Sequence, residues 1–397
     1  IDGSGSINKV GAGTFSLTGA SSYSGGTNLN AGTIAVGNNL ALGTGGLAMA
    51  NGTTLQAASA VALTNAITTA GNSTVDTNGN GFGLSGAITG AGSLTKIGTG
   101  ILTLSGANTY SGGTTVSAGT LAGNSTSLQG NITNNATVDF NQTTAGTYTG
   151  VMSGAGNLVK EGAGTLTVSG SNTYSGGTSL NAGTIAVGNN AALGAGSLAM
   201  ANGTTLQAAS SVSLSNNIST TGAANIDTNG NNLGLSGVIS GASDVNKNGA
   251  GALTLSGINT YSGNTNINAG SVILTGSITS DTNIAAGGTL QGNGVVNGNI
   301  NNAGSIIPSF TGNQTNLTVN GNYVGAGGNF VSNVYAPVTN PVADKLVVSG
   351  TASGATGVTI IDRGGLGNRT SGAGIEVVSV GGNSITNAFA LNQRVRS

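Results

Sequence analysis

Short runs of alternating apolar and polar residues fill this chain of 397 residues. Examples are "TIAVG" from Thr33, "GILTLSG" from Gly100 and "TTVSAGTL" from Thr114. A period of two predicts half-buried strands, and the glycines and asparagines between the runs would break a helix. The pattern therefore predicts an all-β chain. Its inward side chains include Leu102, Leu104, Val116 and Leu121.

The same strand-and-turn motif occurs four times. It reads "NTYSGGT" around Tyr110 and Tyr174, "SSYSGGT" around Tyr23 and "NTYSGNT" around Tyr261. The motif copies belong to a larger internal duplication, since "NAGTIAVGNN" from Asn30 is repeated 151 residues later. Such repeats predict units that stack on one another. We predict a right-handed, single-stranded parallel β-helix (a β-solenoid) with ~20–25 residues per turn, taking its hand from the crossover rule for parallel strands.

The composition narrows the possible functions. Only 5% of the residues are charged and the net charge is −1, which argues against nucleic acid as a partner. The chain has no His and no Cys, so a Ser-His-Asp triad, a disulfide framework and a thiolate metal site are excluded. No apolar run approaches the ~18 residues of a membrane helix. We expect any targeting signal to have been removed or to lie upstream of Ile1.

Charge is concentrated near the C-terminus. Residues 344–397 carry Asp344, Lys345, Asp362, Arg363, Arg369, Glu376, Arg394 and Arg396, and the three prolines are Pro308, Pro337 and Pro341. The strand-like runs also lengthen here. We predict repeats over residues 1–276 and a separate module over 277–397, most divergent after Pro308, which caps the open edge of the last turn.

Two stretches carry a family resemblance. "GAGTLTVSGSNTYSGGTSLNAGTIAVGNN" from Gly162 resembles the passenger-associated repeat of bacterial autotransporters. "ADKLVVSGTASG" from Ala343, with the Gly- and Asn-rich stretch before it, is similar to the pertactin-like C-terminal part of such passengers. Pro308-Ser309 departs from the usual Pro-Gly and predicts a less tight turn. The chain also stops at Ser397, before the linker helix and outer-membrane β-barrel expected of the family.

The resemblance implies a passenger that is exposed on the bacterial surface or secreted, and a C-terminal module that emerges first and acts as an intramolecular autochaperone. It also implies two kinds of partner: the protein's own outer-membrane β-barrel translocator, which is absent from this chain, and a host-cell or matrix receptor or a neighbouring bacterial cell. We expect a non-enzymatic stalk that serves as an adhesin or virulence factor. The alternatives are a spacer carrying an upstream effector or enzymatic head, a self-associating factor, and a carbohydrate-active β-helix, which needs clustered charges.

No catalytic, cofactor-binding or metal-binding residue is predicted. "DTNGNG" from Asp76 resembles half of a calcium loop, but its twelfth position is Ala87 instead of Glu, so an Asx turn is favoured. The G-x-G-x-x-G of Gly81–Gly86 loses its first glycine to Asn232 in the duplicate, which indicates a chance match.

Each motif copy also has a lysine fourteen residues before its tyrosine, namely Lys9, Lys96, Lys160 and Lys247. We expect exposed charges that interrupt sticky strands; the alternative is a basic ladder for an anionic polymer. The tyrosines are expected to pack over the Gly-Gly turn; the alternative is a binding stripe. In the C-terminal module we expect Asp362 and Glu376 to form local ion pairs with Arg363 and Arg369.

Overall fold

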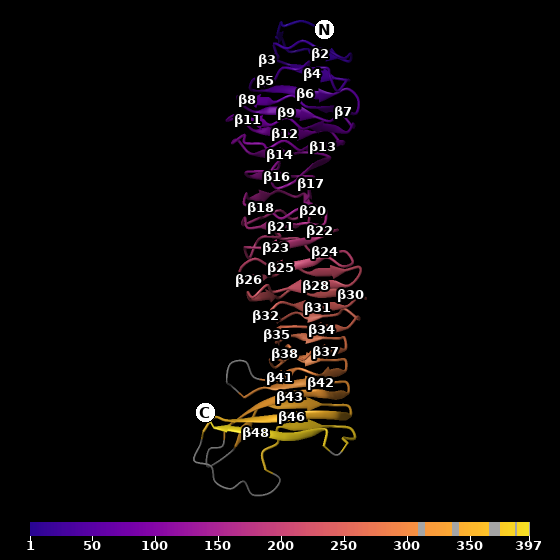
Figure 1. Ribbon diagram of the computed structural model, residues 1–397, viewed down its shortest axis with the longest axis vertical. Helices are drawn as coiled ribbons and strands as arrows, with labels where there is room; N and C mark the ends of the chain where they lie inside the picture. Colours follow the sequence, from indigo (N-terminus) through magenta and orange to yellow (C-terminus); the bar gives the residue numbers. More distant parts are fainter. Residues whose placement is uncertain (309–313, 336–340, 365–373, 386, 397) are drawn as a thin grey trace. The chain divides into compact units, whose positions relative to one another are not determined.

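The protein is an all-β parallel solenoid, as the alternating pattern predicts (Figure 1). The computed structural model describes residues 1–308, 314–335, 341–364, 374–385 and 387–396. The chain forms two compact units, Ile1–Leu198 and Ala199–Ser397. Over the described residues there is no helix, and hence none long and apolar enough to cross a membrane.

In the first unit, each turn of the chain contributes short strands to successive parallel sheets. The first sheet contains β1 (Ile7–Lys9), β3 (Thr27–Leu29), β5 (Leu47–Met49), β8 (Ile67–Thr69) and β11 (Ile88–Thr89). The second contains β2 (Thr14–Leu17), β4 (Thr33–Val36), β6 (Thr53–Ala57), β9 (Ser73–Asp76), β12 (Leu94–Ile97), β14 (Thr114–Val116), β16 (Ile132–Asn134) and β19 (Met152–Ser153). The third contains β7 (Val61–Leu63), β10 (Phe82–Leu84), β13 (Ile101–Leu104), β15 (Thr120–Gly123), β17 (Thr137–Asn141), β20 (Asn157–Glu161) and β22 (Thr178–Leu180), and a further row holds β18 (Gly146–Tyr148), β21 (Thr165–Val168) and β23 (Thr184–Val187).

The second unit repeats this arrangement, after β24 (Leu198–Met200) at the division between the units. One row contains β25 (Thr205–Ala208), β28 (Ala224–Asp227), β31 (Val245–Asn248), β34 (Thr265–Ile267), β37 (Thr282–Ile284) and β40 (Ile300–Asn302). The next contains β26 (Val212–Leu214), β29 (Leu233–Leu235), β32 (Ala252–Leu255), β35 (Gly270–Leu274), β38 (Gly288–Gln291) and β41 (Ser305–Ile307). Others are β27 (Ile218–Thr220) with β30 (Ile239–Gly241), and β33 (Ile258–Asn259), β36 (Ser277–Ile278), β39 (Val295–Val296), β42 (Asn316–Val319), β45 (Lys345–Val348) and β47 (Val378–Val380).

The core is a stack of inward side chains in register. Leu102 of β13 is paired with Phe82 of β10 in the preceding turn and with Leu121 of β15 in the following turn, and all three are buried. Leu104 and Val116, also predicted to face inward, are buried as well. Every turn therefore buries its apolar row against its two neighbours, which is how a thin core remains continuous.

The strands lengthen sharply toward the C-terminus. β43 (Tyr323–Tyr335) has 13 residues, β46 (Ala352–Asp362) has 11 and β48 (Phe389–Arg396) has 8. β43 pairs with both β40 and β41, so one continuous strand covers two rows of the turns before it, and β44 (Val342–Ala343) pairs with it antiparallel. Residues in register one turn apart are 17 positions apart at Asn266 and Asn283 but 29 apart at Tyr323 and Ala352. The wider turns give this part of the chain a broader sheet than the repeats have.

Candidate functional site

The four motif lysines lie inside the solenoid, and this corrects the expectation that they are exposed. Lys96 and Lys160 have no exposed surface, and Lys9 and Lys247 are buried too. Lys96 is two residues after the inward Leu94 on β12, and it is in register with Val75 and Val116. Its aliphatic stem therefore extends the apolar stack, while its ammonium reaches the adjoining corner of the turn.

Backbone carbonyls surround each ammonium. Nζ of Lys96 donates to the carbonyl oxygens of Ile97 at 2.9 Å, Gly98 at 2.7 Å and Ala118 at 3.0 Å, and to Oγ1 of Thr77 at 3.1 Å. Two carbonyls belong to the lysine's own turn, and that of Ala118 belongs to the next turn, 22 residues on. We call this set, a lysine with its three carbonyls, a lysine clamp.

All four copies have the same geometry. The acceptors are the next residue, the glycine after it, and an alanine 22 residues on: Val10, Gly11 and Ala31 for Lys9; Glu161, Gly162 and Ala182 for Lys160; Asn248, Gly249 and Ala269 for Lys247. The contacts to the alanine carbonyls span 2.9 to 3.1 Å. Charge-assisted hydrogen bonds of this kind are the stronger class in proteins.

Glycine allows the carbonyls of the two turns to approach. Gly98 and Gly119 have φ of +78° and +67°, a backbone region that residues with a Cβ rarely adopt. A Cβ on Gly119 would overlap the carbonyl oxygens of Gly98 and Gly100 in the preceding turn. The glycine after each clamp alanine is therefore part of the site.

Burial lowers the pKa of three of the clamp lysines. It lowers the pKa of Lys96 to about 8, against which the charge of Asp76 acts only in part. The pKa of Lys247 falls to about 8 for the same reason, with Asp227 opposing. Burial also lowers the pKa of Lys160, opposed by Glu161 and Asp139. The ammonium charge is thus held by oriented carbonyl dipoles and not by a contacting carboxylate.

The motif tyrosines are buried structural residues, as the packing interpretation predicts. The Tyr110 hydroxyl is 2.6 Å from Oγ1 of Thr114, four residues on, so the ring spans the Gly-Gly turn between them. Tyr23, Tyr174 and Tyr261 make the same contact with Thr27, Thr178 and Thr265. Burial raises the pKa of Tyr261 to about 12. A tyrosine binding stripe is excluded, because none of the four rings is on the surface.

An asparagine two residues before the tyrosine is part of the same site, and the sequence analysis missed it. Buried Asn108 accepts a hydrogen bond from the backbone N of Ile88 at 2.8 Å and donates to the carbonyl of Ser127 at 2.8 Å. Its amide therefore joins the turn before it to the turn after it. Asn172 and Asn259 do the same in their copies, and serine stands at this place in the first copy, at Ser21. The repeated "NTY" was the available signal.

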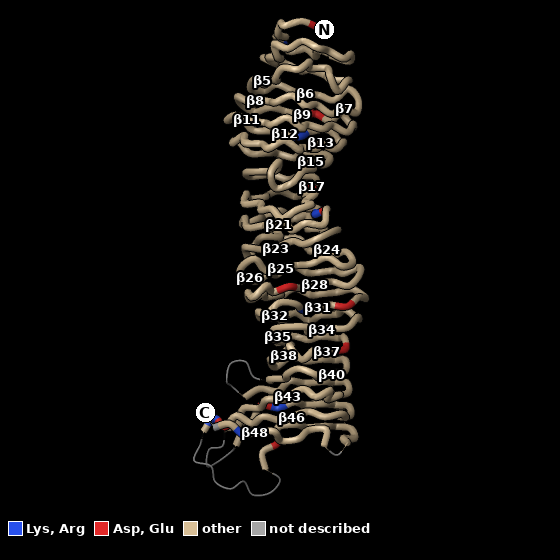
Figure 2. Tube along the Cα trace, viewed as in Figure 1, with Lys and Arg blue, Asp and Glu red and all other residues tan. Residues whose placement is uncertain are grey.

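The clamps do not line up as a basic ladder. In the first unit Lys9 is on β1, Lys96 on β12 and Lys160 on β20, and these strands belong to three different sheets. Together with their burial, this arrangement removes the anionic-polymer alternative. Figure 2 shows charged residues only at scattered positions along the repeats.

The Asp76 stretch forms the expected Asx turn. Oδ1 of Asp76 accepts from the backbone N of Asn78 at 2.8 Å, and Oδ2 accepts from Nε2 of Gln56 at 2.8 Å. Asn78 has φ of +47°, which asparagine tolerates better than most residues. Asp227 and Asn229 repeat the turn in the duplicate. Over the described residues no three His, Cys, Asp or Glu side chains gather to hold a metal ion.

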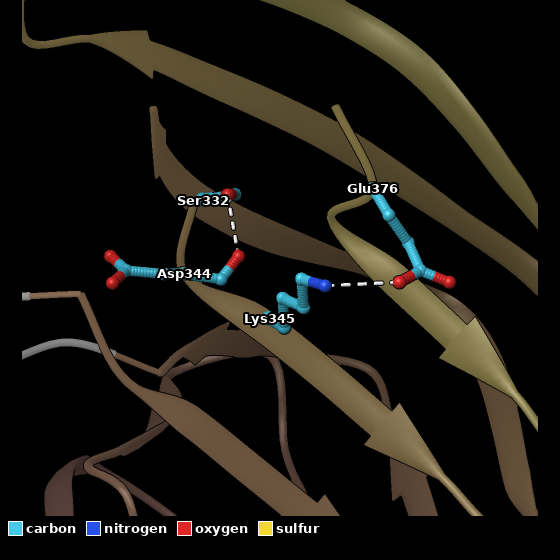
Figure 3. Close-up of polar contacts among 4 residues, drawn as sticks. All are labelled: Ser332, Asp344, Lys345 and Glu376. Atoms are coloured by element: carbon cyan, nitrogen blue, oxygen red, sulfur yellow. Dashed lines mark hydrogen bonds and ion pairs between the residues drawn. The ribbon is translucent and has the colours of Figure 1, made fainter. Parts of the chain in front are cut away.

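Ion pairs form among the described residues of the C-terminal module, with Lys345 and Arg394 as the basic partners. Nζ of Lys345 is 3.0 Å from Oε2 of Glu376, and an Arg394 nitrogen is 2.9 Å from Oδ2 of Asp362 (Figure 3 for the former). The Arg363 Nε donates instead to Asn333, at 2.8 Å. Arg369 and Ser309, of the predicted Pro308-Ser309 turn, lie outside the described residues.

Asp344 is the most deeply buried charged residue in the described part of this module. Its Oδ1 accepts from the backbone N of Thr315 at 2.9 Å, its Oδ2 accepts from Nδ2 of Asn333 at 2.6 Å, and its own carbonyl accepts from Oγ of Ser332 at 2.7 Å. In Figure 3 its carboxylate points away from Lys345. Asp344 thus fastens β43, β45 and the residues before β42 together, which is a structural arrangement and not an acid–base one.

Comparison with known families agrees with this geometry. The passenger-associated transport repeat matches residues 7–36, 94–122, 158–187 and 245–274, so every match contains one clamp lysine and its alanine. The autochaperone domain type 1 matches residues 294–397. The chain therefore belongs to the autotransporter passengers, whose place is the bacterial cell surface or the medium outside the cell.

Individual relatives match parts of the chain. The chain is 36% identical over 238 residues to the adhesin BmaC autotransporter of Brucella suis biovar 1 (strain 1330), which covers 59% of this chain and 7% of the adhesin. It is 37% identical over 163 residues to the uncharacterized protein YuaQ of Escherichia coli (strain K12), covering 40% of this chain and 12% of that protein. A second uncharacterized protein of that strain, YdeU, is 45% identical over 75 residues, which are 19% of this chain and 16% of YdeU. The chain thus spans only a small part of each relative.

Proposed function

We propose that this chain is a non-enzymatic stalk segment of a surface-displayed adhesin, which contacts host cells, matrix or other bacteria. The main support is its similarity to a relative named as an adhesin, over more than half of the chain. The buried clamps, tyrosines and asparagines also support it, because the polar side chains of the repeats serve to join turns and not to hold a substrate. The other expected partner is the outer-membrane translocator that exports the passenger.

We further propose that residues 277–397 form the module that promotes folding during secretion. The autochaperone match begins within this range, at residue 294, and the longest strands, β43 and β46, lie inside it. A wide sheet whose edge is already formed offers a template on which the next turn can pair.

Cell display tests both proposals. A non-adherent bacterium carrying this chain on a functional translocator should attach to host cells or matrix above the level of the empty translocator. Deleting residues 294–397 should abolish the exposed, protease-resistant form of the passenger. Attachment equal to that of the empty translocator would leave an inert spacer as the better reading, and normal display after the deletion would reject the folding role.

Self-association is a second candidate, favoured by one outward row of the second unit. Asn246 donates its side-chain amide to Asn225 at 3.2 Å, Asn266 to Asn246 at 2.9 Å, and Asn283 to Asn266 at 2.9 Å. Asparagine is disfavoured in strands, but uncharged amide ladders can pair between molecules. Clumping of displaying cells that is lost in an Asn246→Ala, Asn266→Ala variant would favour this function over host attachment.

A further inference from the structure

Inward side chains of the first unit bond neighbouring turns in two ways. The clamp bond carries a charge, since Nζ of Lys96 donates to the carbonyl of Ala118 in the following turn at 3.0 Å. Between the clamps the corresponding bonds are neutral: buried Asn65 donates to the carbonyl oxygens of Gly43 at 3.1 Å and Gly45 at 2.7 Å. Hydrogen bonds with one ionised partner are roughly twice as strong as neutral ones. The strongest inward bonds between turns are therefore those of the clamps.

A second bond reinforces the clamp in the later motif copies. Buried Asn108 accepts from the backbone N of Ile88 at 2.8 Å, so the turn containing Asn108 and Ala118 is bonded at two points to the segment from Ile88 to Lys96. The next copy has the same two bonds, from Met152 N to Asn172 at 2.7 Å and from Lys160 to Ala182 at 3.1 Å. The side-chain bonds between turns are thus concentrated at the motif copies.

Tension along a stalk would load these bonds one after another. Each turn of a stacked repeat protein contacts only its neighbours, so a pull on the two chain ends detaches turns in sequence from one end. Detachment should begin in the first unit, where β1 and β2 are the terminal strands of their sheets and have three and four residues. The C-terminal strands β43, β46 and β48 have 13, 11 and 8 residues, so more ladder bonds hold them.

A clamp should resist detachment more strongly than its equilibrium contribution indicates. The bond from Lys96 to Ala118 breaks as soon as the two turns begin to separate, while the ammonium is still inside the solenoid and water has not replaced the lost carbonyl. A buried charge that loses a partner is costly, even though the released lysine is well solvated. This cost belongs to the barrier, and the barrier governs forced unfolding.

We propose that the lysine clamps determine the length of chain that the stalk releases under tension. Lys96 lies 87 residues after Lys9, and Lys160 lies 64 residues after Lys96. The first unit then extends in two increments of these lengths, each ending at the next closed clamp, instead of one turn at a time. Each increment lengthens the stalk and so lowers the load on the adhesive contact. This inference rests on the proposed function in one respect, namely that the chain is a stalk under load.

The test is to pull the full chain by its two ends in an optical trap, with no receptor present. Increments of 87 and 64 residues should appear as extensions of about 290–310 Å and about 210–230 Å, at ~3.3–3.6 Å per residue. In Lys96→Met the pause between them should shorten roughly tenfold, so that one extension of about 500–540 Å replaces the two. Equal extensions of about 70 Å, one for each turn, or an unchanged pause in Lys96→Met, would overturn the proposal.

Two further variants keep the test decisive. Lys160→Met should leave the first increment unchanged while the second no longer ends at residue 160, and this result stands even if Lys96→Met fails to fold. Lys345→Met changes a surface lysine outside the clamps and should leave both increments unchanged. A second increment that still ends at residue 160 in Lys160→Met, or altered increments in Lys345→Met, would count against the clamps. The trap needs no receptor, so its result is independent of whether displaying cells attach to a host cell or matrix.

Discussion

Lysine has opposite surroundings in the repeats and in the C-terminal module. Lys96 is fully buried, and its ammonium contacts three carbonyls and a hydroxyl. The side chain of Lys345 is 30% exposed and pairs with Glu376, which is 55% exposed. The first arrangement removes a charge from water and satisfies it with backbone dipoles, while the second leaves both charges solvated. The comparison shows that a sparse charge in a repeat protein is not necessarily a surface charge.

The largest difference should come from removing each ammonium while keeping its stem. Lys96→Met leaves the part-buried carbonyls of Gly98 and Ala118 without the lysine donor, whereas the carbonyl of Ile97 still accepts from the backbone N of Thr77. Each lost donor costs about 1–3 kcal/mol, offset in part because the charge no longer has to be desolvated. We expect the free energy of local opening around Lys96 to fall by about 3 kcal/mol. Lys345→Met should change the free energy of local opening around Lys345 by less than about 1 kcal/mol, as for other exposed ion pairs.

Native-state hydrogen exchange at the amides near each lysine measures both values. A suitable probe is the Ser117 amide, which donates to the carbonyl of Lys96. Equal losses in the two variants would contradict the distinction between clamp and surface pair.

Two glycines with the same φ allow the cost of backbone strain to be distinguished from the cost of a close contact between turns. Gly119 and Gly130 both have φ of +67°, but a Cβ on Gly130 would meet nothing within 4 Å. Gly130→Ala should therefore cost about 1 kcal/mol of conformational strain. Gly119→Ala should cost about 2–3 kcal/mol, because its methyl group also forces the carbonyls of the clamp apart. Thermal or urea unfolding of the two variants provides the measurement, and a similar cost for both would show that the glycine is needed only for its φ.

Replacing tyrosine by phenylalanine should have a smaller effect on stability, and the effect should differ between the repeats and the C-terminal module. Tyr110→Phe removes the hydroxyl that contacts Thr114 and should cost about 1 kcal/mol, the net value of one hydrogen bond. Tyr335 is 48% exposed, and Tyr335→Phe should leave the stability nearly unchanged. Urea midpoints of the two variants test this, and a neutral Tyr110→Phe would assign the ring's contribution to packing alone.

The clamps should also shape how stability depends on pH. Folding lowers the pKa of Lys96 and Lys247 to about 8, whereas a free lysine has a pKa of about 10.4. Between these values the unfolded chain holds protons that the folded clamps have released, so the free energy of unfolding rises with pH. Above about pH 10 the trend reverses, because folding raises the pKa of buried tyrosines and the unfolded chain loses those protons first. Tyr261, with a pKa of about 12, is an example.

Unfolding between pH 7.5 and 11, in steps of about half a unit, should show this maximum. The rise should shrink in a Lys96→Met, Lys247→Met variant, with the fall at higher pH kept. An unchanged rise in that variant would assign it to other groups.

The sequence predicted the architecture well because the fold depends on local periodicity. Alternation placed Leu102, Leu104 and Val116 in the core, and the repeated "TYSGGT" placed the tyrosines over their turns. These features need only nearest neighbours along the chain, and a period of two determines which side chains face inward.

The lysines were misjudged because residue type was given more weight than position. Lysine is rarely buried, yet Lys96 is two residues after Leu94 and so shares its inward side. The contact to Ala118 could not be derived, because it depends on the length of one turn, and the sequence set that length only within a range. Asn108 escaped notice for the same reason, since its two partners are one turn away in opposite directions.

Burying these lysines has a consequence for digestion. Lys9, Lys96, Lys160 and Lys247 are the only basic residues before Lys345. A protease that cuts after Lys or Arg therefore has just these four targets over the first 344 residues, and all four are buried. Cleavage must wait for a clamp to open, so its rate reports the population of opened turns. The bonds that hold the turns together thus also remove from the surface of the repeats the residues that trypsin-like enzymes recognise.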